Sequence, residues 1–255
     1  MDLQLQGKTA FISGSSQGIG FAIAKQLLKE GATVIINGRN KEKLNDAIAQ
    51  LQPLGNVSGI AGDIAAIVHE VPPVDILVNN VGIFELRSFF DLTDEDWLHY
   101  FNVNVMSSVR LSRALMPAML EKKQGRVIFI SSEAGVNIPA NMIHYGMTKT
   151  AMLSISRGLA QLTKGTAVTV NTILGGPTYS DGVKKAVEHI ASQQQVDADQ
   201  LKTNIFNSTN PGSLLQRFID PQEIAQLATY LASPVSIATN GAALRADGGV
   251  LNTIL

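Results

Sequence analysis

Short apolar runs rich in β-branched residues alternate along the chain with longer stretches of helical periodicity. Several of the short runs are apolar almost throughout, which is typical of strands covered by helices on both faces. The alternation predicts an α/β fold, a doubly wound, mostly parallel seven-stranded sheet in a three-layer α/β/α arrangement. The expected strands are Thr9–Ser13, Thr33–Ile36, Val57–Ile60, Asp75–Asn79, Arg126–Ser131, Ala167–Thr172 and Ala242–Ala246. The expected helices lie near 19–30, 41–51, 94–120, 145–163 and 221–232.

One long segment, 178–213, departs from this alternation. It is polar and carries a helical stripe of Val183, Val187 and Ile190. Because long insertions beside a site often close on a ligand, we expect a substrate lid here. A surface subdomain that packs its own apolar face is the alternative. No linker or repeat divides the chain, so residues 1–255 are expected to form a single domain with the lid as an insertion.

Composition narrows the class of protein. The chain has 255 residues, a net charge of −1 and 16% charged residues, against about 25% in typical proteins. So little charge implies extensive burial, part of which could lie between subunits. The near-neutral balance argues against nucleic acid as a partner, because phosphate binding needs a concentrated basic surface.

Several chemistries and locations are also excluded or favoured by residue type. The chain has no cysteine, which excludes thiol catalysis, thiolate metal sites and disulfides. Its four histidines show no short ligand spacing, so we expect no metal site. No apolar run reaches the roughly 18 residues of a membrane span, and the first residues lack a signal-peptide pattern. We therefore expect a cytoplasmic protein with no membrane partner.

The first expected strand runs into a glycine-rich turn that opens a helix. Glycines allow a tight turn and let a phosphate approach the free N–H groups of the helix N-terminus. The spacing Gly-x3-Gly-x-Gly differs from the shorter dinucleotide fingerprint, and a tight turn without a ligand is the alternative. The position after the first strand favours a cofactor site. Its candidate contacts are Gly14, Ser15, Ser16, Gln17, Gly18, Ile19 and Gly20.

The end of the second strand bears on which cofactor binds. In nucleotide-binding folds an acidic residue near this point holds the ribose hydroxyls, whereas an arginine can hold a 2′-phosphate. Here Gly38 stands in place of the acid and Arg39 follows it. A guanidinium matches phosphate geometry well. This pattern predicts NADP(H) rather than NAD(H), with a solvated arginine as the alternative.

Polar residues and glycines also follow the third and fourth expected strands. Asp63 and Ile64 are placed beside the expected adenine, and Asn80, Val81 and Gly82 close to a ribose. Ligands of such sheets bind outside the carboxyl ends of the strands. Structural turns are the alternative for each piece alone, but their occurrence at successive strand ends favours cofactor contacts.

A candidate reacting group lies beyond the fifth strand. Ser132 ends that strand, and Tyr145 and Lys149 follow at i and i+4 of a helix, which places both on one face. A phenol has a pKa near 10, so only about 0.1% is ionised at pH 7. A nearby ammonium lowers that pKa and prepares the tyrosine for proton transfer. The arrangement predicts acid–base chemistry on a carbonyl or alcohol.

Taken together, these motifs resemble the short-chain dehydrogenase/reductase family of the single-domain type. The resemblance rests on the glycine turn, Asn79-Asn80-Val81-Gly82, Ser132, Tyr145-x3-Lys149 and Asp247-Gly248-Gly249, and covers nearly the whole chain. It implies a Rossmann-like fold. In the family an asparagine follows a tryptophan by seven residues, and here Asn104 and Trp97 stand in that relation.

The resemblance implies a role for each of these residues. Tyr145 would be the general acid in reduction and the base in oxidation, and Ser132 would hydrogen-bond the substrate oxygen. Lys149 would hold the nicotinamide ribose and lower the pKa of Tyr145, while Asn104 would hold a water that relays protons. Tyr145 and Lys149 thus also count as cofactor contacts.

The sequence departs from the family pattern in three places. The turn after the sixth strand usually reads Pro-Gly, whereas here it is Gly-Gly-Pro-Thr, which could loosen the nicotinamide clamp; its candidate contacts are Gly175, Gly176 and Thr178. Gln17 stands where NADP-binding relatives often carry a basic residue, so the phosphate preference depends largely on Arg39. The segment between Asp63 and Asp75 is short, and its helix is expected to be a stub.

The leading hypothesis is an oxidoreductase that transfers a hydride between NADP(H) and a carbonyl or alcohol substrate. A non-catalytic NADP(H)-binding sensor is the alternative. The resemblance implies a homo-oligomer, a tetramer or a dimer. The substrate pocket is expected around Glu133, Ala134, Ile138 and His144. Glu133 itself is expected to face solvent, with a contact to a polar or cationic substrate group as the alternative. Sugar, steroid, acyl-thioester and small-ketone substrates all remain open.

Overall fold

The computed structural model describes residues 1–254, whose strands form one sheet of seven. The strand order is β3-β2-β1-β4-β5-β6-β7, and every neighbouring pair is parallel. This confirms the predicted doubly wound fold and makes the sheet wholly parallel. The strands are β1 (Thr9–Ile12), β2 (Thr33–Gly38), β3 (Val57–Ala61), β4 (Ile76–Asn79), β5 (Gln124–Ser132), β6 (Ala167–Gly175) and β7 (Ala243–Ala246).

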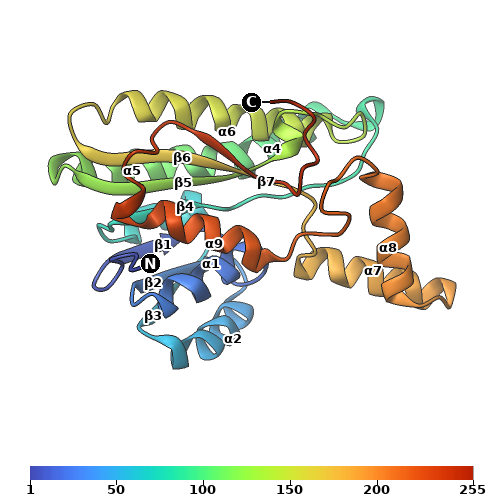
Figure 1. Ribbon diagram of the computed structural model, residues 1–255, viewed down its shortest axis with the longest axis horizontal. Helices are drawn as coiled ribbons and strands as arrows, with labels where there is room; N and C mark the ends of the chain where they lie inside the picture. The colour runs from blue at the N-terminus through green and yellow to red at the C-terminus, as the bar shows by residue number, and fades with distance from the viewer. Residues whose placement is uncertain (255) are drawn as a thin grey trace.

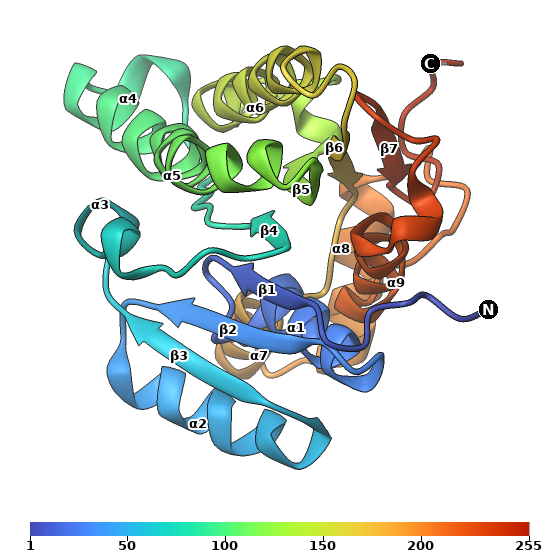
Figure 2. The same ribbon diagram turned by 90° about the vertical axis from the view of Figure 1, so that its left-hand side faces the viewer.

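Two hydrophobic cores lie on opposite faces of the sheet, because successive side chains of a strand point to opposite sides. Phe11 and Phe129 enter one core, and their neighbours Ile12 and Ile128 enter the other. Helices cover both faces (Figure 2). On one face lie α1 (Gly18–Lys29), α2 (Lys41–Leu51) and α9 (Pro221–Ala232), and on the other α3 (Ile64–Ile67), α5 (Ser107–Glu121) and α6 (Ile143–Gln161).

The predicted helix 94–120 is divided by a π-helical turn. It consists of α4 (Asp94–Tyr100), the π turn Phe101–Met106 and α5. Such turns are uncommon and occur frequently at functional sites. Here the turn contains Asn104, whose side chain is fully buried.

The segment that departs from the β–α alternation forms two helices that project from the body of the molecule (Figure 1). They are α7 (Asp181–Gln194) and α8 (Ala198–Thr209), which pack on each other. Val187 of α7 and Phe206 of α8 are buried, whereas Val183 is half-exposed. Short 3-10 turns complete the described elements: Gln52–Leu54, Val68–Glu70, Phe89–Asp91, Glu133–Gly135 and Pro234–Ser236.

Two helix ends follow directly from the sequence. Asp220 caps α9, because its carboxylate accepts from the backbone N–H of Gln222 at 2.8 Å. The Glu223 carboxylate accepts in turn from the backbone N–H of Asp220, and Pro221 occupies the first turn. The α3 helix is only four residues long, the stub expected from the short segment. Within residues 1–254, no helix is long and apolar enough to cross a membrane.

Candidate active site

A cleft of about 860 Å³ lies along the carboxyl ends of the strands. A parallel sheet brings all of these ends to one edge, which is why motifs far apart in the sequence meet here. Three expected site residues, Ser15, Gly20 and Asn104, lie beneath the surface of the cleft instead of lining it. The expected residues that do line it are Gly14, Ser16, Gln17, Gly18, Ile19, Arg39, Asp63, Ile64, Asn80, Val81, Gly82, Ser132, Tyr145, Lys149, Gly175, Gly176 and Thr178.

The backbone conformation of the glycine turn favours glycine at two of its positions. Gly14 and Gly18 have φ values of 60° and 63°, which favour glycine. A Cβ at Gly14 would also lie 3.1 Å from the Val81 side chain. The Asn80 amide donates to the Gly14 carbonyl at 2.8 Å and so ties the end of β4 to the turn. The turn therefore presents backbone without side chains at the start of α1, the kind of position at which an anion can bind.

The two buried residues of the turn support it from behind. Ser15 donates to the Ile12 carbonyl at 2.6 Å and accepts from the N–H of Asn37 at 3.0 Å, so its hydroxyl is fully engaged within the fold. A Cβ at Gly20 would lie 2.5 Å from the Asn80 amide nitrogen. Both residues shape the turn without reaching the cleft.

Asn37 organises three strand ends, and sequence reasoning gave it no role. Its Oδ1 accepts from the N–H of Gly14 at 3.2 Å, and its Nδ2 donates to the carbonyls of Ile60 and Gly62 at 3.0 and 3.1 Å. The side chain is almost wholly buried. The available signal was a polar residue inside an otherwise apolar strand, which needs hydrogen-bond partners wherever it is buried.

One end of the cleft combines an exposed cation with small residues. Arg39 is exposed, and within residues 1–254 it has no hydrogen-bond or ion-pair partner. A Cβ at Gly38 would lie 2.9 Å from the Ser16 hydroxyl, so only glycine lets these residues approach. Asp63 accepts from the N–H of Ala65 at 2.9 Å and caps α3. Arg110, which sequence reasoning missed, also lines the cleft from α5.

The start of α7 reaches across the cleft to the glycine turn. Asp181 accepts a hydrogen bond from the backbone N–H of Gly18 at 2.7 Å, over 163 residues of sequence. Val183 lines the cleft two residues later, and Phe218 lines it from the segment before α9. The apolar stripe of α7 is thus divided, with Val187 packed inside and Val183 turned to the cleft.

At the other end of the cleft, β5 and α6 bring together Ser132, Tyr145 and Lys149. The Lys149 Nζ lies 5.5 Å from the centroid of the Tyr145 ring and donates to the Ile130 carbonyl at 2.9 Å. Ser131 donates to the Lys149 carbonyl at 2.9 Å and fixes α6 against the end of β5. A Cβ at Gly82 would lie 3.3 Å from Nζ, so glycine leaves space in front of the ammonium.

Burial sets the charge state of these groups. It lowers the pKa of Lys149 to about 8, because the ammonium loses hydration, while the negative charge of Glu133 opposes the shift. It raises the pKa of Tyr145 above that of a free phenol, a shift which the hydrogen bond with Ser132 opposes. The expected lowering of the Tyr145 pKa by Lys149 is therefore not found, because burial of the phenol dominates. Tyr145 holds its proton at neutral pH and can donate it.

Asn104 connects the π turn to the reacting end of the cleft, which is the end formed by Ser132, Tyr145 and Lys149. Its Oδ1 accepts from the N–H of Ile83 at 2.8 Å, and its Nδ2 donates to the Ile83 carbonyl and to the Thr148 hydroxyl, both at 3.0 Å. The amide hydrogens are thus used, while a second lone pair of Oδ1 stays available. Asn104 holds the loop after β4 against α6, one turn from Tyr145.

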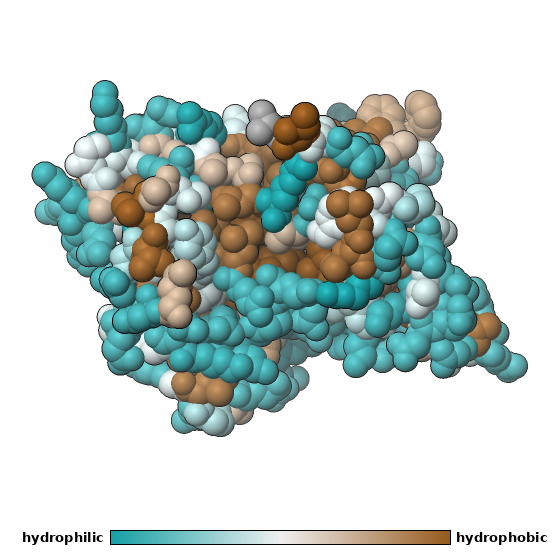
Figure 3. Space-filling model, in the orientation of Figure 1, coloured by the Kyte–Doolittle hydropathy of each residue, from teal (hydrophilic) through white to brown (hydrophobic). Residues whose placement is uncertain are grey.

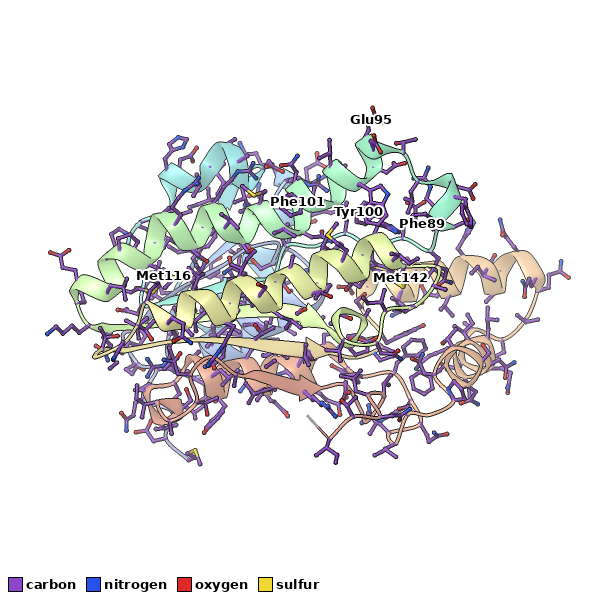
Figure 4. The ribbon with its side chains drawn as sticks, turned by 90° about the horizontal axis from the view of Figure 1, so that it is seen from above. Phe89, Glu95, Tyr100, Phe101, Met116 and Met142 are labelled. Atoms are coloured by element: carbon purple, nitrogen blue, oxygen red, sulfur yellow. The ribbon has the colours of Figure 1, made fainter. Side chains whose placement is uncertain are left out.

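His144, immediately before Tyr145, points away from the cleft into the contact between α4 and α6. It is fully buried, its ring lies 4.3 Å from that of Tyr100, and neither ring nitrogen has a hydrogen-bond partner within residues 1–254. Figure 4 shows Tyr100 between these helices. Burial lowers the pKa of His144, so the ring is neutral at pH 7. It therefore packs the helix that carries Tyr145.

The turn after β6 closes the reacting end from the opposite side. Gly175 pairs with Ser132 on β5 and with Ala246 on β7. A Cβ at Gly176 would lie 2.6 Å from the backbone of Asp247, so the close approach of the chain after β7 requires glycine at position 176. The Thr178 hydroxyl donates to the Gly176 carbonyl at 2.8 Å and stiffens a turn that lacks the usual proline.

Comparison with known proteins identifies the family. Residues 8–191 match the model of the short chain dehydrogenase family. The chain is 46% identical to the uncharacterized oxidoreductase YvrD of Bacillus subtilis, with both chains covered completely. The chain belongs to the short chain dehydrogenase family. As a member of this family it is an oxidoreductase.

Relatives and solved structures of the family extend over the whole chain. The 3-oxoacyl-[acyl-carrier-protein] reductase FabG of Vibrio cholerae is 31% identical over 97% of this chain and 99% of its own length. L-sorbose reductase from Gluconobacter frateurii, solved with NADPH and L-sorbose, matches with a TM-score of 0.93 and 30% identity over the full length of both chains. The oxidoreductase fold is thus preserved from end to end.

Proposed function

We propose that this short chain dehydrogenase transfers a hydride between NADP(H) and a carbonyl or alcohol substrate, with Tyr145 as general acid and base. The observation that carries the proposal is the placement of Ser132, Tyr145 and Lys149 at one end of a cleft whose other end offers an open glycine turn and an unpaired arginine. Solved relatives such as L-sorbose reductase contain NADPH, which supports the same choice of cofactor.

The residues of the cleft fit a dinucleotide phosphate. Gly14 and Gly18 leave no Cβ in the path of a diphosphate at the start of α1. Arg39 and Ser16 would hold the 2′-phosphate, since Arg39 has no competing partner within residues 1–254. Asp63 and Ile64 would border the adenine, and Val81 and Gly82 the ribose beside Lys149. Gly175, Gly176 and Thr178 would border the nicotinamide.

The proton chemistry follows from the reacting end. The bound cofactor supplies the hydride. Ser132 and Tyr145 would hold the substrate oxygen, and the raised pKa of Tyr145 keeps its proton ready for donation in reduction. Lys149 would bind the ribose hydroxyls and supply positive charge near the phenol oxygen. Asn104 would hold a water on its remaining Oδ1 lone pair and connect Lys149 to solvent.

A non-catalytic NADP(H) sensor is the second candidate. No observation at the reacting end favours a sensor, because all four proposed catalytic residues are present. A sensor would bind NADPH tightly and turn over no carbonyl compound.

The test is NADPH and NADH consumption over a panel of ketones and aldehydes, with Tyr145→Phe purified alongside. We expect turnover that favours NADPH and falls by about 10²- to 10⁴-fold in Tyr145→Phe, the usual contribution of a general acid. NADPH affinity should stay nearly unchanged. Equal turnover by the variant would remove Tyr145 from the mechanism.

The proposal includes a lid and a homo-oligomer. The segment 178–213 would act as a substrate lid on the single domain, since Asp181 and Val183 already border the cleft. Hydrophobic residues gather on the face over β6 and β7 (Figure 3). Leu214, which is 85% exposed, lies beside Gly249 just after β7. These exposed apolar side chains support association with further copies of the chain. Sedimentation velocity of the purified protein would distinguish a dimer, a tetramer and a monomer. The cytoplasm is the proposed location.

A further inference from the structure

Glu133 lies at the reacting end and has no task in the chemistry described so far. It follows Ser132 directly, lines the cleft and is half-buried, although the sequence favoured a solvent-facing position. The Ser132 hydroxyl donates to its Oε2 at 2.6 Å. The one proton of Ser132 is therefore directed to a neighbouring carboxylate and away from the position of a substrate oxygen.

Glu133 has no cationic partner. Within residues 1–254, no lysine or arginine lies within ion-pair distance of its carboxylate. Lys149, whose pKa the charge of Glu133 raises, is bonded to the Ile130 carbonyl. Burial and the nearby charge of Asp247 raise the pKa of Glu133, while hydrogen bonds from Ser132 and from the backbone oppose the shift. The carboxylate depends on hydrogen-bond donors for its stability.

Substrate binding would remove one of these donors. Ser132 has a single proton, so it cannot donate to a substrate carbonyl oxygen and to Glu133 at the same time. A carboxylate that loses its donor in a half-buried site is left with an unsatisfied acceptor, which is unfavourable. The balance is restored when the substrate brings a donor of its own. A hydroxyl on the carbon next to the carbonyl lies close enough to the carbonyl oxygen to reach the neighbouring carboxylate.

The charges that line the cleft also favour an uncharged substrate over one that carries a carboxylate or phosphate near the carbonyl. Three cations line the cleft, and two of them, Arg39 and Arg110, lie toward β2 and α5, away from Tyr145. The third, Lys149, is buried and faces the Tyr145 ring. No exposed cation therefore stands beside Glu133 to receive a substrate carboxylate or phosphate, and like charges repel.

Resting on the proposed function, we propose that Glu133 is a specificity-determining residue, which selects ketones that carry a hydroxyl on the carbon adjacent to the carbonyl and rejects ketones that carry a carboxylate there. The substrate hydroxyl replaces the Ser132 hydroxyl as the donor to Glu133, and Ser132 is released to donate to the carbonyl oxygen. The substrate class is thus α-hydroxyketones.

The test is equilibrium binding to the protein saturated with NADP⁺, in which a ketone binds without reacting. The probes are 1-hydroxybutan-2-one, pentan-3-one, in which a methyl group replaces the hydroxyl, and 2-oxobutanoate, in which a carboxylate replaces the whole hydroxymethyl group. Isothermal titration calorimetry gives the affinity of wild type, Glu133→Met, Glu133→Gln and the control Glu70→Gln, whose exposed carboxylate lies outside the cleft. NADP⁺ affinity shows that each variant is folded.

We expect wild type and Glu70→Gln to bind 1-hydroxybutan-2-one at least tenfold more tightly than pentan-3-one, and 2-oxobutanoate most weakly. Glu133→Met should lose the preference for the hydroxyl, and Glu133→Gln should bind 2-oxobutanoate at least tenfold more tightly than wild type does. Equal binding of the two uncharged ketones, no binding of either, or a preference that survives in Glu133→Met would overturn the proposal.

The proposed function is judged by a separate measurement. Turnover of the same ketones with NADPH depends on Tyr145, whereas the binding preference does not. Absent turnover would therefore count against the reductase reaction, and absent preference against the role of Glu133.

Discussion

In the proposed function, Arg39 is the cation that would distinguish NADPH from NADH, with the Ser16 hydroxyl beside it. Its side chain is exposed and unpaired within residues 1–254, beside the Ser16 hydroxyl and the glycine that precedes it. Gln17, in the neighbouring turn, is neutral. In the proposed function, a preference for the 2′-phosphate would therefore depend mainly on this guanidinium.

We predict that Arg39→Ala weakens NADPH binding by about 1–3 kcal/mol, the usual range for a charge-assisted hydrogen bond, and leaves NADH binding unchanged. Fluorescence titration of both cofactors measures this. Lys41→Ala, a change at the exposed start of α2, is the matched control. Equal losses for the two cofactors would place Arg39 outside the phosphate site.

Lys149 illustrates the conflict between stability and function at a single residue. Its pKa falls from 10.5 to about 8 on burial, so the folded protein binds this proton less tightly than the unfolded chain does. At pH 7 the charged, buried ammonium thus destabilises the fold by roughly 3 kcal/mol. Its hydrogen bond to the Ile130 carbonyl offsets part of this destabilisation.

We predict that Lys149→Met raises the free energy of unfolding by about 1–2 kcal/mol at pH 7 while removing turnover. Because the folded pKa is the lower one, the gain is complete below pH 8 and disappears as the pH approaches 10.5. Urea denaturation at several pH values measures it. A variant that is less stable than wild type at pH 7 would show that packing around the ammonium matters more than its charge.

At the scale of elements, one polar contact joins α7 to α1 in the described part of the chain, residues 1–254. The Asp181 carboxylate accepts from the N–H of Gly18 at the position where a diphosphate would approach. Two anions cannot share this N–H, and they repel each other. Cofactor binding would therefore require the start of α7 to move or Asp181 to turn away.

We predict that Asp181→Asn tightens NADPH binding by several-fold, about 1 kcal/mol, because the repulsion is removed. Glu188→Gln, a charge removal at an exposed position of the same helix, should leave the affinity unchanged. Fluorescence titration compares the two. Weaker binding by Asp181→Asn would mean that the carboxylate positions the lid and does not compete with the cofactor.

At the scale of the whole molecule, the cleft connects distant parts of the fold. It is lined by residues at the carboxyl ends of β1 to β6 and by α7. A ligand that binds only the folded state stabilises it by RT ln(1 + [L]/Kd), about 2.7 kcal/mol at one hundred times Kd. For a chain of this size that raises Tm by roughly 5–10 °C.

We predict such a rise with NADPH and a smaller one with NADH at the same concentration, read by differential scanning calorimetry. Arg39→Ala should bring the NADPH shift down to that of NADH. An unchanged Tm with both cofactors would count against a dinucleotide in this cleft.

The sequence predicted a mostly parallel sheet and most of the residues that line the cleft, and it could do so for a physical reason. Hydrophobic periodicity is local, and in a parallel sheet the carboxyl ends of the strands are brought to one edge, so the motifs that follow the strands must meet. The positions of Gly14, Arg39 and Tyr145 along the cleft follow from this rule alone. The divided helix around Asn104 did not, since a π turn has almost the same apolar pattern as an α-helix.

Only the tertiary structure decided what each polar side chain contacts. Ser15 stands beside cleft residues in sequence and Asn37 lines the cleft, yet the hydrogen bonds of both side chains lie inside the fold. Glu133 stands in a segment expected at the surface, yet Ser132 donates to it. Partners such as Asp181 and Gly18 come from distant parts of the chain, and no periodicity encodes them. The sequence determined the fold and where its chemistry gathers, and three-dimensional packing determined which groups are free to act.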